Sequence, residues 1–238
     1  MDTFSGRWVL IFFFFCSAGF SQPRDSTYTL YLIPGLGMDE RLFQGLDVPC
    51  KIKVIKWIPV NKHESLKDYA LRMAQAIDTT HPFSIAGVSF GGMCVIEIAK
   101  VYKPRHAILI SSIKTKREMP FRMKLLRIFP IYRIMSDQVC IRSAMIARSM
   151  FGIQKAQSGL FHDMMKTMPP KYYRRAVHCV VSWKNKVYPS GLMHIHGSKD
   201  RIFPLKKIKD PVVVPGGTHL MILTDAQNIS VILKTIFP

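Results

Sequence analysis

The order of apolar and polar positions divides the chain into short apolar runs and longer segments with helical spacing. Between residues 64 and 78 the apolar side chains recur three and four residues apart, which places them on one face of a helix. Apolar runs of β-forming residues, the first of them ended by Pro34 and Gly35, are typical of strands. The pattern predicts strands at residues 27–33, 52–58, 83–88 and 106–110, and helices at residues 64–78 and 90–102. This alternation favours an α/β fold class with a doubly wound, mostly parallel sheet.

The alternation stops after Ser111 and returns only near residue 192. The segment between, residues 114–186, is rich in Met, Arg and aromatic side chains and contains prolines that break helices. We interpret it as an insertion that forms a helical cap, whose apolar side chains pack against the sheet or line an acyl pocket. The pattern then predicts strands at residues 192–196 and 212–214 and a closing helix at residues 220–236. One domain over residues 27–238, with the cap inside it, accounts for the length and the 48% hydrophobic content.

The first residues have the layout of a secretory signal peptide. Arg7 precedes an apolar run over residues 8–15, which is followed by small residues and then by polar ones. This run is shorter than the roughly 20 residues that a membrane-spanning helix needs. The sequence therefore predicts a signal peptide at residues 1–22 and a periplasmic or secreted protein, with an uncleaved membrane anchor as the alternative.

Positive charge is concentrated in the predicted cap. The formal net charge is +19, and residues 114–186 contain sixteen Lys and Arg against three carboxylates. Such an excess suits an anionic partner. Because no nucleic-acid-binding motif accompanies these residues, an anionic membrane surface or a charged acyl substrate is favoured over nucleic acid, and a solvated basic face is the alternative.

Ser89 stands where a predicted strand meets a predicted helix, within Gly87-Val88-Ser89-Phe90-Gly91. The backbones of strand and helix approach closely at such a turn, so residues without side chains are needed at positions 87 and 91. The serine also lies at the start of a helix, where backbone N–H groups favour developing negative charge. The pattern predicts a serine nucleophile on a sharp turn.

A serine hydroxyl needs a base, and a carboxylate that orients the base, to act as a nucleophile. If nucleophile, acid and base follow one another in this order along the chain, the base has a single candidate, His219, which is the only histidine beyond Asp200 and lies in the loop after the last predicted strand. Asp200 follows the strand at residues 192–196 and is the preferred acid. Glu118, beyond the preceding strand, is the alternative, whereas Asp210 directly precedes a strand and would lie at its wrong end.

Three stretches of the chain together resemble the α/β-hydrolase superfamily: residues 87–92, residues 196–204 and residues 217–219. The resemblance extends over nearly the whole chain from about residue 27. It implies the α/β-hydrolase fold, with Ser89 as nucleophile and with Asp200 and His219 as its acid and base.

The resemblance also implies an oxyanion hole built from backbone N–H groups. Phe90, the residue after the nucleophile, would supply one donor. The second would come from Leu36 in the loop after the first strand, with Gly37 as the alternative. Many relatives have His-Gly at the start of this loop, where this chain has Pro34-Gly35.

The predicted function is a serine hydrolase, needing no cofactor or metal, that cleaves a carboxylic ester or thioester of a small-molecule acyl substrate. Amide hydrolysis, acyl transfer and C–C cleavage use the same groups. The alternative is a non-catalytic module of the same fold whose basic cap binds anionic lipid or another polyanion. His194 and His196 lie on one strand face without a third ligand of suitable spacing, so we interpret them as core or strand-end histidines.

Overall fold

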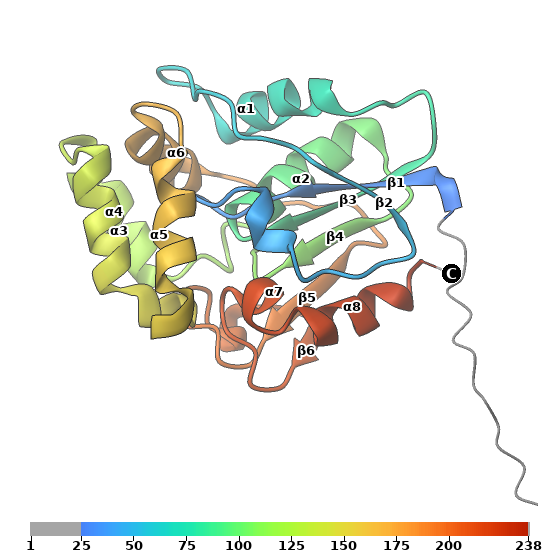
Figure 1. Cartoon of the computed structure of the whole chain (residues 1–238). Helices are drawn as coiled ribbons and strands as arrows, with labels where there is room; N and C mark the ends of the chain where they lie inside the picture. The colour runs from blue at the N-terminus through green and yellow to red at the C-terminus, as the bar shows by residue number, and fades with distance from the viewer. Residues whose placement is uncertain (1–24, 238) are drawn as a thin grey trace, which may run out of the picture.

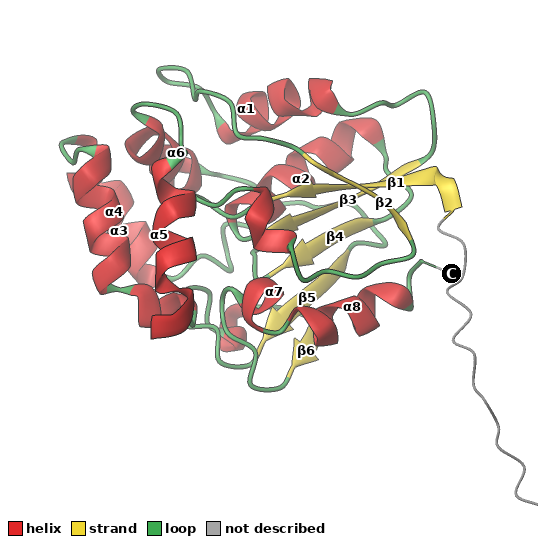
Figure 2. Cartoon of the chain, in the orientation of Figure 1, coloured by secondary structure: helices red, strands yellow, loops and turns green. Residues whose placement is uncertain are grey.

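Every neighbouring pair of strands in the sheet is parallel, which confirms the predicted fold class. The computed structural model describes residues 25–237, and their six strands form one sheet in the order β2-β1-β3-β4-β5-β6 (Figure 2). The strands are β1 (Asp25–Ile33), β2 (Cys50–Val54), β3 (Phe83–Val88), β4 (Ala107–Ile110), β5 (Met193–Gly197) and β6 (Val212–Val214).

Helices cover both faces of the sheet. Helices α1 and α2 pack on one face and α8 on the other (Figure 1). The α-helices are α1 (Leu66–Met73), α2 (Phe90–Tyr102), α3 (Phe121–Ile128), α4 (Asp137–Ile146), α5 (Ser158–Lys166), α6 (Tyr172–Ser182), α7 (Met221–Thr224) and α8 (Ala226–Lys234). The short 3₁₀ helices are η1 (Glu40–Phe43), η2 (Ala74–Ala76), η3 (Ile131–Arg133), η4 (Arg148–Phe151), η5 (Lys155–Gln157) and η6 (Leu205–Lys207).

The order of the strands fixes where a site can form. β1 lies between β2 and β3, so the chain leaves β1 toward one edge of the sheet, to β2, and leaves β3 toward the other edge, to β4. The order of the strands therefore reverses between β1 and β3. Ile33 at the end of β1 is in register with Gly87 near the end of β3. Ligands of doubly wound sheets bind beyond the carboxyl ends of the strands at such a switch point. The loops after β1 and β3 are therefore the two that frame the expected site.

The helices inserted between β4 and β5, α3 to α6, are called the cap here. They lie together at the end of the molecule toward which the strand arrows point, at the left of Figure 1. Helices α5 and α6 bury large side chains such as Phe161, Met164 and Tyr172, as the sequence predicts. Helices α3 and α4 contain no fully buried residue, and only part of their apolar side chains, among them Met123 and Ile141, packs against the core.

Several predicted elements have other bounds in the structure. The helix predicted at residues 64–78 is α1 followed directly by η2, and two further differences have a clear physical reason. The strand predicted at residues 52–58 ends at Val54, because its only neighbour β1 ends one residue after the Leu32–Val54 pair. The helix predicted at residues 220–236 is divided at Asp225, whose φ of −146° and ψ of 43° are not helical. The predicted signal peptide lies outside the described residues. Within residues 25–237, no helix is both long and apolar enough to cross a bilayer.

Candidate active site

Ser89 occupies a strained turn between β3 and α2. Its φ of 53° and ψ of −115° are unusual for a residue with a side chain. Two contacts from the end of β4 hold this conformation: the Ser89 N–H donates to the Ile110 carbonyl at 2.9 Å, and the Ser112 hydroxyl donates to the Ser89 carbonyl at 2.6 Å. The strain is therefore fixed by hydrogen bonds to the neighbouring strand.

The two glycines around Ser89 are required by close backbone contacts. A Cβ atom on Gly87 would lie 2.3 Å from the carbonyl oxygen of Gly91. A Cβ atom on Gly91 would lie 2.3 Å from the carbonyl oxygens of both Ile33 and Pro34. No side chain fits at such distances, so the spacing of the glycines follows from the geometry of the turn.

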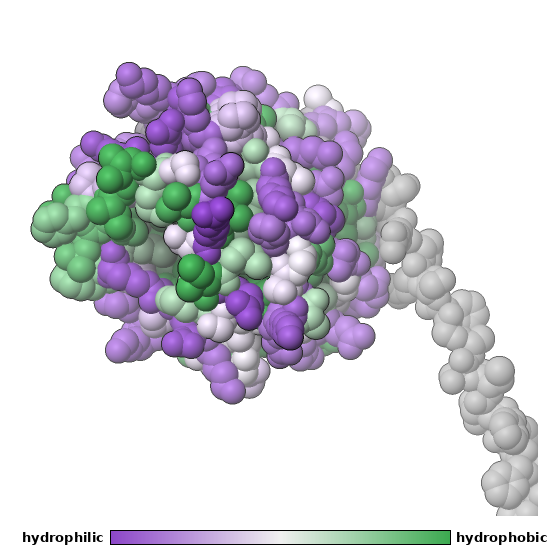
Figure 3. Space-filling model, turned by 60° about the vertical axis from the view of Figure 1, so that its left-hand side comes forward, coloured by the Kyte–Doolittle hydropathy of each residue, from purple (hydrophilic) through white to green (hydrophobic). Residues whose placement is uncertain are grey.

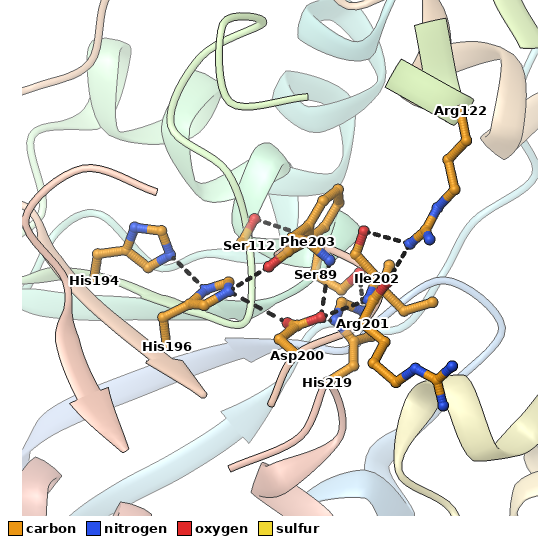
Figure 4. A network of polar contacts seen from close by, with 10 residues as sticks. All are labelled: Ser89, Ser112, Arg122, His194, His196, Asp200, Arg201, Ile202, Phe203 and His219. Atoms are coloured by element: carbon orange, nitrogen blue, oxygen red, sulfur yellow. Dashed lines mark hydrogen bonds and ion pairs between the residues drawn. The ribbon is translucent and has the colours of Figure 1, made fainter. Parts of the chain in front are cut away.

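Ser89, His219 and Asp200 form a hydrogen-bonded row (Figure 4). Nε2 of His219 lies 2.9 Å from Oγ of Ser89, and Nδ1 of His219 lies 2.8 Å from Oδ2 of Asp200. Because a carboxylate only accepts, Nδ1 carries the proton, and Nε2 is left to accept from the serine hydroxyl. Asp200 and His219 are buried, whereas Ser89 is half-buried and remains accessible. The structure thus brings together the three residues that the sequence predicts.

The carboxylate of Asp200 is fixed by its own loop. Its Oδ1 accepts hydrogen bonds from the backbone N–H groups of Ile202 and Phe203, each at 2.8 Å. Burial by itself raises the pKa of Asp200, but the electrostatic attraction and hydrogen bond of His219 and the hydrogen bond from the Phe203 N–H outweigh it. The pKa of Asp200 is therefore held below its ordinary value, and the group is an anion at neutral pH.

Two further histidines lie behind Asp200, and the sequence patterns did not predict that one of them contacts this carboxylate. His194 and His196 are buried core histidines, as predicted, but Nε2 of His196 lies 3.5 Å from Oδ2 of Asp200 and 2.7 Å from the Phe203 carbonyl. Nδ1 of His196 lies 3.3 Å from Nε2 of His194. Burial lowers the pKa of both side chains, that of His194 to about 3, so both are neutral at pH 7. The four-residue interval between His196 and Asp200 was the available signal.

Cap residues contact the loops of the site. The ring centroid of Phe151, a cap residue, lies 5.9 Å from that of His219. The ring of Phe203, which belongs to the loop of Asp200, lies 5.5 Å from the same imidazole. From α3, the guanidinium of Arg122 donates to the carbonyl oxygens of Arg201 and Ile202, directly after the acid (Figure 4). The cap therefore touches both the histidine and the acid loop, and no sequence motif marks Arg122 for this role.

The predicted oxyanion donors lie in the two loops that frame the switch point. Phe90 is the first residue of α2, where backbone N–H groups have no partner within the helix. The Met38 N–H donates to the Gly35 carbonyl at 3.0 Å, which closes a turn with Leu36 and Gly37 in its central positions. The Leu36 N–H is not used by this turn. A Cβ atom on Gly35 would lie 3.7 Å from that of Ser89, so the turn lies beside Ser89.

Glu118, the alternative acid, has another role. Its two carboxylate oxygens accept the backbone N–H groups of Lys114 at 2.6 Å and Lys209 at 3.1 Å. The side chain is buried and joins the loop after β4 to the segment before β6. It is Asp200, not Glu118, that contacts His219.

A hollow of about 240 Å³ lies beside the turn at residues 35–38. It is lined by Pro34, Asp39, Glu40, Val54, Lys56, Trp57, Thr167, Met168 and Pro169. None of Ser89, Asp200 and His219 lines it, so the hollow does not contain the hydrogen-bonded row. Within residues 25–237, no three His, Cys, Asp or Glu side chains are grouped so as to hold a metal ion.

Comparison with known proteins finds solved structures of the same fold. No family model and no curated protein matches this sequence. Among solved structures, the chain is similar to a thermophilic esterase from Thermogutta terrifontis, with a TM-score of 0.64 and 15% identity over 89% of each chain. MenH from S. aureus gives a TM-score of 0.67 and 12% identity over 88% of this chain and 92% of that one.

A third similar structure is YbtT, a type II thioesterase of the yersiniabactin biosynthetic pathway. Its TM-score is 0.63 and its identity 15%, over 90% of this chain and 94% of that one. These matches, together with the all-parallel sheet, show that the chain has the α/β-hydrolase fold. At such identities the likeness concerns the fold alone.

Proposed function

We propose that this protein is a serine hydrolase that cleaves a carboxylic ester or thioester through an acyl-enzyme intermediate. The observation that carries the proposal is the row of hydrogen bonds from Ser89 through His219 to Asp200. The names of similar structures, an esterase and a thioesterase among them, agree with an acyl substrate. A serine in this position, rather than an aspartate, disfavours dehalogenase and epoxide-hydrolase chemistry.

Each residue of the row has one task in the proposed reaction. Nε2 of His219 takes the proton of the Ser89 hydroxyl as Oγ attacks the acyl carbonyl, and returns it to the leaving alcohol or thiol. Asp200 holds the imidazole in the tautomer with the proton on Nδ1 and stabilises the imidazolium that forms. Water, activated by the same histidine, then releases the acid and restores the serine.

The negative charge that develops on the acyl oxygen needs donors that are already in place. We assign these to the backbone N–H groups of Phe90 and Leu36, because they belong to the loops that meet at Ser89. Removing one such donor costs a factor of roughly 10² to 10³ in turnover in serine hydrolases. The backbone of this loop lies close to the turn at Ser89, since a Cβ atom on Gly91 would meet the Pro34 carbonyl.

Labelling with a fluorophosphonate probe tests the proposal directly. The probe reacts with an activated serine, so the wild-type protein is expected to be labelled and Ser89→Ala is not. Turnover of a p-nitrophenyl ester is expected to fall by a factor on the order of 10⁶ in the same variant. Ser143→Ala is the matched control, because Ser143 is exposed on α4 and distant in sequence from all three groups. Equal labelling of Ser89→Ala and wild type would refute the proposal.

A further inference from the structure

The cap exposes an unusual number of large apolar side chains. Within the described residues, eight of the fourteen exposed large hydrophobic side chains lie between residues 121 and 146. They are Phe121, Leu125, Ile128, Phe129, Ile131, Ile134, Val139 and Ile146, and we call them the apolar cap face. Ile134 and Ile146 are 89% and 83% exposed. Figure 3 shows hydrophobic side chains gathered at the left-hand edge of the molecule, on the side of the cap.

The helices present these side chains in stripes that point away from the core. Phe121, Leu125 and Ile128 recur at helical spacing along α3 and are exposed, whereas Met123 and Leu126 between them are half-buried. Val139 and Ile146 likewise lie two turns apart on one face of α4. Helix α3 therefore has apolar side chains on its inner face and presents a second apolar stripe to solvent, where an ordinary surface helix has polar residues.

Exposed cations accompany the apolar cap face. Lys124, Arg127, Arg133 and Arg142 are all exposed within the same segment. From residue 119 to residue 150 the only carboxylate is Asp137, whose Oδ2 accepts the backbone N–H of Lys171 at 2.6 Å. The face therefore combines protruding aliphatic and aromatic tips with positive charge and almost no opposing negative charge.

We propose that the apolar cap face docks on an anionic lipid surface. Apolar side chains that enter the boundary between headgroups and acyl chains, flanked by Lys and Arg that attract anionic headgroups, are the chemistry by which a helix lies in a membrane interface. An exposed patch of this kind marks an interaction site. Nucleic acid offers no partner for eight apolar side chains, and a second copy of this chain would bring two sets of cations together.

The segment that carries the apolar cap face also contacts the loops of the candidate active site. Arg122 of α3 donates to the carbonyl oxygens of Arg201 and Ile202 in the acid loop. At the other end of the segment, the Phe151 carbonyl accepts the Leu220 N–H at 3.0 Å, one residue after His219. The apolar cap face thus includes α3, which contacts the acid loop, and ends close in sequence to η4, which contacts the histidine loop. The proposal does not depend on catalysis, because it concerns binding alone.

Sedimentation with vesicles tests the proposal on the full chain. We expect binding to vesicles of phosphatidylcholine mixed with phosphatidylserine, weaker binding to phosphatidylcholine alone, and loss of binding as salt is raised. Arg127→Glu combined with Arg133→Glu is expected to lower the partition coefficient by at least roughly 30-fold, since each cation lost at an anionic surface costs about fivefold and each introduced carboxylate is repelled as well. Ile134→Asp combined with Ile146→Asp is expected to lower it by roughly 10-fold or more.

Matched controls carry the same changes away from the cap. Lys51→Glu with Lys67→Glu alters the net charge equally on exposed residues of β2 and α1, and Val231→Asp alters an exposed side chain of α8. These variants are expected to bind like the wild type. The proposal is overturned if cap variants and controls bind equally, if lipid charge makes no difference, or if the cap variants only convert a dimer to a monomer in sedimentation velocity. Hydrolysis of a soluble ester, measured in parallel, reports separately on the proposed function.

Discussion

Replacing Asp200 by Asn tests the role of the acid more sharply than deleting it. Oδ1 of Asp200 accepts two backbone N–H groups, from Ile202 and Phe203, and an amide nitrogen cannot replace it there. The oxygen of the introduced amide is therefore held by these donors, and its NH₂ group must face Nδ1 of His219. A donor at this position forces the imidazole into the other tautomer, with the proton on Nε2. The histidine then has no lone pair for the Ser89 hydroxyl.

The expected loss follows from this wrong tautomer. In serine proteases the same exchange lowers kcat by about 10⁴, which corresponds to about 5 kcal/mol in the barrier. We expect a loss of this order in kcat for a p-nitrophenyl ester, with the far-ultraviolet circular dichroism unchanged. Glu118→Gln is the matched control, because Glu118 is also buried and bound to backbone N–H groups but does not contact His219. A loss below tenfold in Asp200→Asn, or an equal loss in Glu118→Gln, would show that the acid is wrongly assigned.

Two further predictions concern stability. Gly91→Ala is expected to lower the free energy of unfolding in urea by about 3 kcal/mol or more, because its Cβ would meet the Pro34 carbonyl at 2.3 Å. Gly159→Ala, in α5 with open space around it, is the control and should stabilise by about 0.5 to 1 kcal/mol; similar effects of both would contradict the packing argument. Because the pKa of His194 is lowered, the unfolded chain binds a proton between about pH 3 and pH 6.5 that the folded chain does not bind. The free energy of unfolding is therefore not reduced by this group above pH 6.5, and it falls as the pH decreases from 6.5 toward about 3. In urea unfolding measured across this pH range, His194→Gln should reduce the slope of the free energy of unfolding against pH by about 1.4 kcal/mol per pH unit, and an unchanged slope would refute this.

Patterns of neighbouring residues in the sequence were enough to predict the strand, turn and helix around Ser89. The bounds of β3 and α2 agree with prediction, because a buried strand followed by an apolar helix at Gly87-Val88-Ser89-Phe90-Gly91 leaves little choice of register. Asp200 and His219 were found because strand ends on one edge of a parallel sheet converge. The second strand was predicted too long, since alternation continues to Trp57 while the partner strand does not.

Long-range contacts and the orientation of the cap were beyond such patterns. Nothing in the sequence near Arg122 indicates that its guanidinium reaches carbonyl groups 79 and 80 residues later. The apolar residues of α3 have helical spacing, which ordinarily indicates a buried stripe. That this stripe faces solvent depends on how α3 rests on α6, a tertiary arrangement that periodicity does not encode.

All three side chains of the row stand on loops at the ends of sheet strands, and none comes from the helices inserted between β4 and β5. A relative's insertion placed between these two strands would accordingly leave Ser89, His219 and Asp200 with the recipient, but it would have to replace the contacts that Arg122 and Phe151 make with their loops. In such chimeras, the choice of acyl group and of surface would follow the transplanted segment, while the bond-breaking step would stay with the recipient. Evolution and protein engineering thus have a natural boundary at which to separate recognition from chemistry in this fold.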